Sequence, residues 1–106
     1  MTAAVVRGAV VLTVCGDLDC TSGPRLCRFL TAACTAFAPR IVVDLAAVRF
    51  MDSAGLSILL TAHHRAAKAG GRLRLAGASE QVLAVLERVG VAAVIGAYPT
   101  VAAALA

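Results

Sequence analysis

The stretch IVVDLAAVRFMDSAGLSILL, residues 41–60, decides the fold because it joins a buried strand to a helix through a short turn. Its opening apolar run is typical of a central strand that is covered on both faces. After the turn, Leu56, Leu59 and Leu60 recur at helical spacing. Ser53 follows Asp52 at the expected helix start, where a serine is a common cap worth about 1 kcal/mol. The stretch therefore predicts a strand, a turn and a helix, with a serine at the junction.

Turn and capping residues divide the rest of the chain into further short elements. The first half is expected to contain two strands that meet at Arg7-Gly8, a helix from about Ser22 to Phe37, and a strand at 40–45. A helix from Ser53 to Ala69, a strand at 72–77, and a helix capped by Ser79 and ended by Gly90 should follow. The tail is expected to form a buried strand, a turn at Tyr98-Pro99 and a short alanine-rich helix. The expected inward faces of the three longer helices are Leu26, Leu30, Ala33 and Phe37, then Leu56, Leu59, Leu60 and Ala67, then Val82, Leu83, Leu86 and Val89.

This order predicts an α/β fold with a mixed central β-sheet of about five strands and about four α-helices packed against it. The chain has 106 residues, enough for one core without staples, so a single domain spanning 1–106 is expected. Because 60% of the residues are hydrophobic but only 4% are aromatic, the core must consist of valine, leucine, isoleucine and alanine.

Charge and cysteine content narrow the classes of function. The net charge of +4 is scattered along the chain and is not interleaved with aromatic residues, so direct nucleic-acid binding is not expected. The four cysteines form no CxxC pair, and Cys27 and Cys34 lie two helical turns apart, too far for a disulfide. We therefore expect all four to be buried thiols in a reducing, cytoplasmic environment.

Membrane insertion is also not expected. Arg7 interrupts any early apolar run that could serve as a signal peptide. The tail at 89–106 is uncharged and formally reaches transmembrane length. Two glycines, Pro99 and Thr100 interrupt it, however, and much of the remainder is alanine, which favours a folded tail.

No motif in the chain points to catalysis, to a metal or to a cofactor. There is no GxSxG elbow, and the glycines form neither GxGxxG nor a Walker loop. His63 and His64 are adjacent and would diverge by about 100° on a helix, so edge-of-core histidines are expected. Asp44 and Asp52 lack the further early carboxylates that a phospho-accepting aspartate site needs for Mg²⁺. We expect a protein that is not an enzyme.

The residues around Ser53 leave two interpretations of this serine open. One is a helix cap alone, and the other is a hydroxyl that is modified. A phosphate at a helix N-terminus is tolerated, because free N–H groups and the positive end of the helix dipole lie there. It would add nearly two negative charges to the surface beside Asp52, and near Asp17 or Asp19.

GDLDCTSGPRL, residues 16–26, looks like the GELD segment of STAS domains, and the run from Ile41 to Ser79 is similar, nearly end to end, to their core. The resemblance continues through VLAVLERVGV, residues 82–91, to the ending YPTVAAALA, residues 98–106, so it covers almost the whole chain. The Asp-Ser-x-Gly-Leu spacing from Asp52 to Leu56 is the most specific part. Among STAS proteins, the chain most resembles the stand-alone anti-sigma factor antagonists.

The resemblance implies a partner switch. The unphosphorylated antagonist would bind an anti-sigma factor that is a serine/threonine kinase, and so would free a sigma factor indirectly. The kinase would phosphorylate Ser53, and a PP2C-type phosphatase would reset it. The implied partner surface, with Asp19 expected beside Ser53, consists of Asp19, Asp52, Ser53, Ala54, Gly55 and Leu56.

Some residues depart from the family pattern. Asp17 replaces the commoner glutamate, and the last helix lacks its usual acidic residues. Two other functions therefore stay open: an accessory STAS subunit that docks the ATPase of a membrane ABC lipid transporter without phosphorylation, and a nucleotide-binding STAS module.

Overall fold

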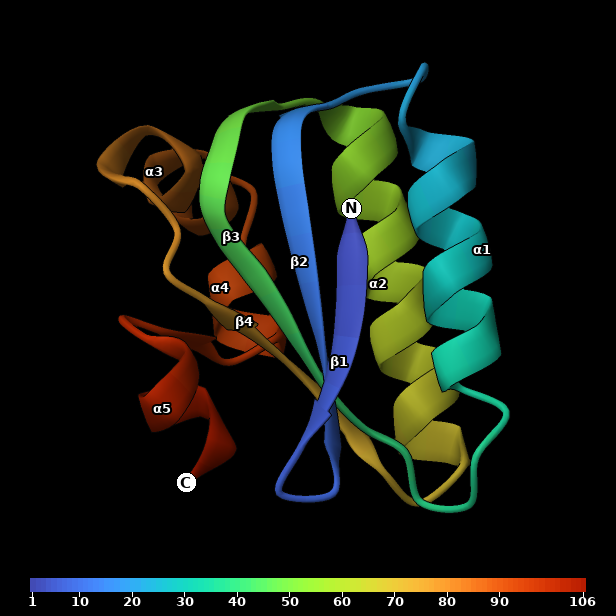
Figure 1. Cartoon of the computed structure of the whole chain (residues 1–106). Helices are drawn as coiled ribbons and strands as arrows, with labels where there is room; N and C mark the ends of the chain where they lie inside the picture. The colour runs from blue at the N-terminus through green and yellow to red at the C-terminus, as the bar shows by residue number, and fades with distance from the viewer.

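Five strands form one mixed sheet in the spatial order β1-β2-β3-β4-β5 (Figure 1). The computed structural model describes every residue from 1 to 106. The strands are β1 Thr2–Val6, β2 Ala9–Leu18, β3 Arg40–Met51, β4 Arg72–Ala76 and β5 Ala97–Tyr98. β1 pairs antiparallel with β2, and every other neighbouring pair is parallel. The predicted α/β fold with a mixed five-stranded sheet is confirmed.

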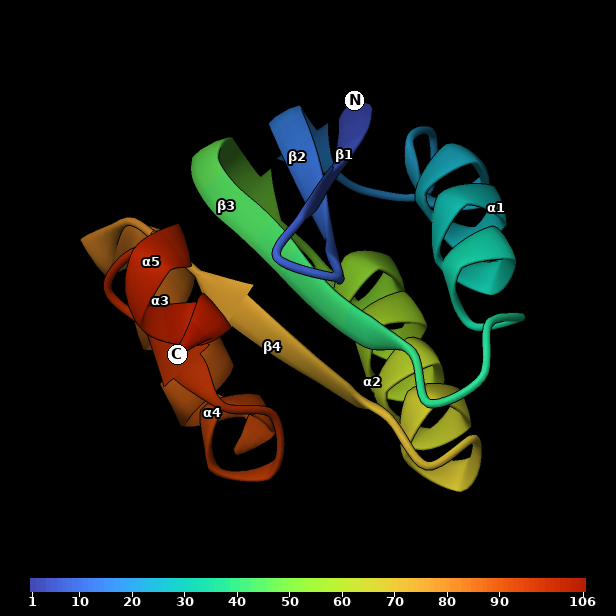
Figure 2. The same ribbon diagram turned by 60° about the horizontal axis from the view of Figure 1, so that its bottom comes forward.

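The five helices are α1 Gly23–Ala33, α2 Ser53–Lys68, α3 Glu80–Arg88, α4 Val91–Val94 and α5 Val101–Leu105. α1 and α2 lie side by side, and α2 also packs against β3 and β4 (Figures 1 and 2). On the opposite face of the sheet, α5 lies beside β4 (Figure 2). None of these helices combines the length and the apolar character that crossing a bilayer requires.

The core divides into two clusters on opposite faces of the sheet. The larger one has 20 buried residues and joins the sheet to α1, α2, α3 and α4. The smaller one has four, Val11, Val42, Ala76 and Ala104, and lies under α5. Neighbouring residues in β2 and β3 belong to different clusters because successive strand side chains point to opposite faces. Both central strands are therefore covered on two sides, as the continuous apolar run predicted.

The first helix is shorter than predicted, and Phe37 is not part of its buried face. α1 ends at Ala33, and the Phe37 side chain is 98% exposed. The Thr35 hydroxyl donates to the Ala32 carbonyl at 2.7 Å, which satisfies a carbonyl of the last turn. Phe37 therefore lies four residues beyond the end of the helix, in the loop that leads to β3, where the next residue, Ala38, adopts a positive φ of 48°.

The tail also differs from its prediction. A buried strand was expected directly after Gly90, but Val91–Val94 form α4 and only Ala97–Tyr98 form a strand. Val91 and Ile95 are buried while Ala93 is exposed, which is helical spacing, because a strand would place residue 93 on the same face as residues 91 and 95. The short helix at the C-terminus is confirmed.

Two of the expected inward residues face outward. Ala67 is exposed, and Ala62 and Ala66 are the buried alanines of α2. Ala62 and Ala66 follow Leu59 by three and seven residues, so they lie on the same face of the helix, whereas Ala67 lies outside that face. Val89 is 53% exposed because α3 ends at Arg88. The Ser79 cap is confirmed, since its side chain accepts the Val82 N–H.

The prediction of four buried cysteines is wrong. Cys15, Cys20 and Cys27 are exposed, and Cys34 is half-buried. Leu12, Val14 and Leu18 face the larger core cluster, so strand alternation places Cys15 on the opposite face of β2, where its side chain is exposed. Cys20 lies in the loop before α1.

Leu45→Ala should lower the free energy of unfolding by about 2–5 kcal/mol, because Leu45 is fully buried and a cavity would remain. Phe37→Ser should change it by less than about 0.5 kcal/mol, since the ring contacts solvent. Urea denaturation measures both. An equal loss in the two variants would contradict the described end of α1.

Candidate functional site

The candidate site lies where β2 and β3 end side by side. Their parallel register places Leu18 opposite Met51 at the last pair. The Asp52 N–H then donates to the Leu18 carbonyl at 3.0 Å, which extends the pairing by one further bond. The loop after β2 and the start of α2 are therefore brought to the same end of the sheet (Figure 1).

Asp52, and not Ser53, is the cap of α2. Asp52 has extended backbone angles, and its Oδ1 accepts the N–H groups of Ala54 at 2.9 Å and Gly55 at 3.3 Å. Its own carbonyl accepts the first helical bond, from the Leu56 N–H at 3.1 Å. The interpretation of Ser53 as the cap is therefore wrong. Ser53 is the first helical residue, and its exposed side chain takes no part in the cap.

Gly55 and Leu56 are held by the core. A Cβ at position 55 would come within 3.1 Å of both the Cβ and the carbonyl oxygen of Leu18, and within 3.3 Å of Met51. A side chain at position 55 would therefore require Leu18 or Met51 to shift by a few tenths of an ångström, and glycine avoids this crowding. Leu56 is buried in the larger core cluster, and Ala54 is half-buried beside it.

Asp19 organises the loop that adjoins this helix start. Its Oδ1 accepts the N–H groups of Thr21 at 2.9 Å and Ser22 at 3.2 Å. The Ser22 hydroxyl in turn donates to the Asp17 carbonyl at 2.7 Å. Asp19 was expected beside Ser53. It lies at the same end of the sheet, directly after Leu18, but its hydrogen bonds go to its own loop and none goes to Ser53.

The end of the sheet is acidic although the whole chain is basic. Asp17, Asp19 and Asp52 provide three of the six carboxylates in the chain. One cation, Arg49, lies 3.9 Å from Asp17, and both side chains are substantially exposed, so this ion pair contributes little stability. Any further negative charge placed here would meet like charge.

Two residues of this surface were missed by the sequence analysis. Phe50 is 53% exposed at the end of β3, next to Arg49. Both line a shallow hollow together with residues of α3. Strand alternation was only a partial signal: it turns Phe50 away from the core-facing Met51, but it would also place Arg49 in the core, and the register shift opposite Asp17 leaves both residues exposed.

The remaining candidate groups are dispersed. His63 is half-buried and His64 is exposed, as expected for histidines at the edge of the core. Their ring centroids are 5.4 Å apart with the planes tilted by 60°. No group of three or more histidine, cysteine, aspartate or glutamate side chains is placed to hold a metal ion.

Comparison with known proteins assigns the class. The family model of the STAS domain matches residues 1–104, which is almost the whole chain. The chain therefore belongs to the STAS domain family, as the sequence resemblance predicted. No curated protein sequence matches it closely enough to add a particular relative.

Several solved structures are similar to the chain. An anti-sigma factor antagonist from Mycobacterium paratuberculosis is 27% identical, with a TM-score of 0.89 over 98% of this chain and 88% of the other. An anti-sigma-factor antagonist (STAS) domain protein from Planctomyces limnophilus is 20% identical, with a TM-score of 0.86 over 98% and 93%. A sulfate transporter family protein from Wolinella succinogenes is 20% identical, with a TM-score of 0.79 over 96% and 85%. The same fold thus occurs in antagonists and in transporters.

Asp52→Ala should lower the free energy of unfolding by about 1 kcal/mol, because two N–H groups of the first turn lose their acceptor. Ser53→Ala should change it by less than about 0.5 kcal/mol. Thermal and urea unfolding monitored by circular dichroism provide the comparison. A larger loss for Ser53→Ala than for Asp52→Ala would reverse the assignment of the cap.

Proposed function

We propose that the protein is an anti-sigma factor antagonist whose switch is Ser53. In the unphosphorylated form it binds an anti-sigma factor that is a serine/threonine kinase, and the sigma factor is released. Phosphorylation of Ser53 by that kinase causes the complex between the two proteins to dissociate. The observation that carries the proposal is that Ser53 is the one exposed residue from Asp52 to Leu56.

The local hydrogen bonds explain why a phosphate on Ser53 would face outward. The N–H groups of Ala54 and Gly55, which could otherwise hold an anion, already donate to Asp52. The phosphate would therefore stay in solvent, close to the Asp52 carboxylate. It would raise the negative charge of an end that already holds three carboxylates, and a docked surface that tolerates Ser53 would be repelled.

The neighbouring Phe50 provides an anchor for such a partner. A half-exposed phenylalanine beside an arginine is the kind of pair that carries much of the binding energy at interfaces. Phe50 and Ser53 are three residues apart and flank the end of β3. We infer that one partner surface covers both.

The proposal makes the protein a non-catalytic regulator. A PP2C-type phosphatase would restore the hydroxyl of Ser53, and the whole cycle would take place in the cytoplasm, where sigma factors act. The similarity to solved anti-sigma factor antagonists supports this assignment.

A second candidate rests on the similarity to transporter STAS domains. In that case the same end of the sheet would dock a transport ATPase, such as that of an ABC lipid transporter, and Ser53 would stay unmodified. The two candidates differ in whether Ser53 accepts a phosphate, which the next experiment measures.

Incubation with the anti-sigma kinase encoded nearest to this protein's gene and Mg-ATP should add one phosphate, detected by intact-mass spectrometry and assigned to Ser53 by fragmentation. Ser53→Ala should remove the signal, and Ser57→Ala should keep it, because Ser57 is equally exposed one turn later on α2. No added phosphate, or phosphate on another residue with Ser53 untouched, would sink the proposal.

Ser53→Asp should weaken binding of the same kinase by about 2–5 kcal/mol, since an uncompensated carboxylate would enter the interface. Ala36→Asp, which adds the same charge in the exposed loop after α1, should leave affinity unchanged. Isothermal titration calorimetry compares the two.

Phe50→Ala should weaken the same complex by about tenfold or more, because the anchor is lost. Phe37→Ala removes an even more exposed phenylalanine from the opposite end of β3 and should have no effect. Equal losses for the two variants would place the partner elsewhere on the protein.

A further inference from the structure

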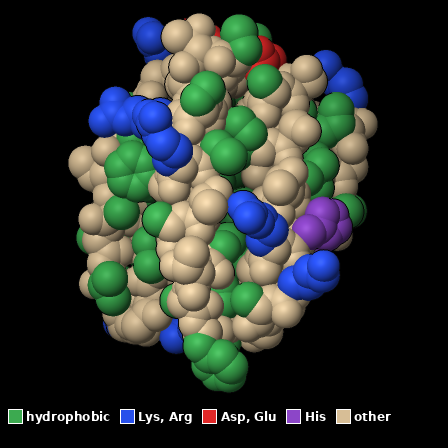
Figure 3. All heavy atoms as spheres, turned by 90° about the vertical axis from the view of Figure 1, so that its right-hand side faces the viewer, with side chains coloured by type: hydrophobic (Ala, Val, Ile, Leu, Met, Phe, Trp, Pro, Cys, Tyr) green, Lys and Arg blue, Asp and Glu red, His purple; other side chains and the backbone are tan.

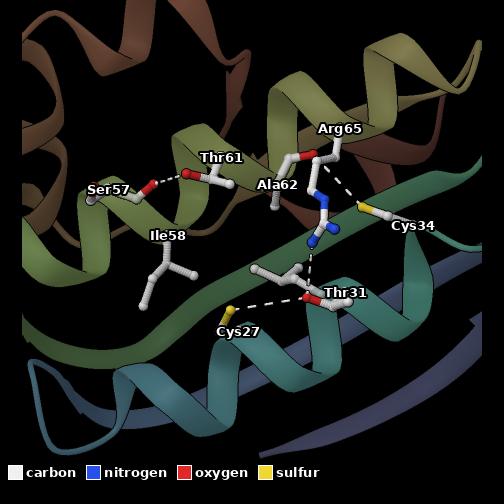
Figure 4. A pocket seen from close by; sticks show the side chains of 9 residues that line it. Cys27, Thr31, Cys34, Ser57, Ile58, Thr61, Ala62 and Arg65 are labelled. Carbon is white, nitrogen blue, oxygen red and sulfur yellow. Dashed lines mark hydrogen bonds between the residues drawn. The ribbon is translucent and has the colours of Figure 1, made fainter.

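A cavity between α1 and α2 is not used by the proposed switch. Its volume is about 110 Å³. Figure 4 shows Cys27, Thr31 and Cys34 on the α1 side, facing Ile58, Thr61 and Arg65 on α2. The cavity therefore follows the seam of the two helices instead of the end of the sheet.

The cavity is apolar and narrow. Ile58, the buried Leu30 and Ala62, and the two thiols supply most of its wall. The Cys34 thiol donates to the Ala62 carbonyl at 3.7 Å, and burial raises its pKa although Arg65 partly opposes this, so the sulfur stays uncharged. The volume is below the ~150 Å³ of an apolar cavity that takes up benzene, so neither a nucleobase nor a whole aliphatic chain would be enclosed, and a flexible chain would lie along the seam with part of its length outside the cavity.

One end of the cavity is cationic. A second hollow adjoins it and shares Thr31, Cys34 and Arg65, with Lys68 added to its wall. The Arg65 guanidinium donates to the Thr31 hydroxyl at 3.2 Å, which holds the cation across the seam between the helices (Figure 4). The apolar cavity therefore ends at two positively charged side chains, those of Arg65 and Lys68.

The surrounding helices favour an anion. α1 and α2 contain no aspartate or glutamate, and their cations are Arg25, Arg28, Arg65 and Lys68. Figure 3 looks onto this side of the molecule and shows blue side chains next to hydrophobic patches, with red only at the upper edge. An anionic head group would find no like charge along the seam.

We propose that this seam binds an aliphatic monocarboxylate of medium length, with its hydrocarbon between Cys27 and Ile58 and its carboxylate at Arg65 and Lys68. The levels of Ser57 and Arg65 on α2 are separated by about 12 Å, which an extended chain of about eight carbons spans. The site is separate from Ser53 and does not depend on the proposed switch.

Octanoate is the probe, titrated below its micelle concentration into the ¹⁵N-labelled full chain. We expect saturable amide shifts confined to the facing sides of α1 and α2. Octylamine has the same chain and a positive head, and it should bind at least about tenfold more weakly. Absence of saturable shifts with octanoate, or equal binding of octylamine at the same residues, would overturn the proposal.

Paired variants locate the ligand. Cys27→Phe fills the seam from an exposed position and should abolish the octanoate shifts, whereas Ala32→Phe, exposed on α1 outside the cavity, should retain them. Thr61→Phe fills the same space from α2 and replaces Cys27→Phe if that variant does not fold. Retention of binding in the filled variant would overturn the site.

The charge requirement has its own control. Arg65→Gln should weaken octanoate binding by about tenfold, and Arg88→Gln, which removes the same charge from α3, should not change it. Octanoate should also slow alkylation of Cys27 by iodoacetamide but not that of Cys15, which lies on β2 away from the seam. If Arg65→Gln and Arg88→Gln weakened binding equally, or if octanoate slowed alkylation of Cys27 and Cys15 equally, octanoate would be associating with the surface in general. Either result would contradict the proposal.

Discussion

The parallel pairing of β2 with β3 is the constraint on which the rest of the structure depends. Leu18 lies opposite Met51, and the Asp52 N–H donates to the Leu18 carbonyl. This register fixes the loop that Asp19 organises against the start of α2. It also favours glycine at position 55, because a Cβ there would crowd Leu18 at the end of β2. Loop, cap and exposed serine are consequences of one strand register.

The energies at this helix start explain how a charged switch can coexist with the fold. Two like charges about 4 Å apart at a solvated surface repel by roughly 1–4 kcal/mol. A domain of this kind is stable by roughly 5–15 kcal/mol, and the exposed Ser53 side chain is not part of its larger core cluster of 20 residues. Added charge at Ser53 would thus act on a bound neighbour more than on folding.

Much of the fold could be predicted because its signals are local. The apolar run of β3, the leucines of α2 and the Ser79 cap each depend on residues close in sequence, and the structure has them where the patterns indicated. The errors arose where non-local packing decides. Phe37 continues the helical stripe in sequence, but α1 ends at Ala33, so the helical face stops before residue 37. The sequence from Val91 to Ile95 is equally compatible with a buried strand and with a helix, and only the packing of this segment beside α3 distinguishes the two.

The candidate site was predicted as a set of residues but not as an arrangement. Asp52 and Ser53 are adjacent candidates for the same cap, and sequence alone cannot tell which side chain reaches the N–H groups of the first turn. Similarly, nothing local indicates that Asp19 bonds to its own loop, or that Phe50 is exposed beside it. The seam between α1 and α2 is formed by residues about thirty positions apart, and no sequence pattern joins them.

The Asp-Ser-x-Gly-Leu motif divides unequally between folding and regulation. Asp52 caps the helix, Gly55 permits the close approach to β2, and Leu56 fills the core. Each of these residues is accounted for by packing or hydrogen bonding alone. Only the side chain of Ser53 takes no part in capping the helix or in packing the core. A genome survey that selects on the whole motif would therefore mostly recover domains of this architecture, and the residue found at position 53 would be the informative character for sorting switched members from constitutive ones.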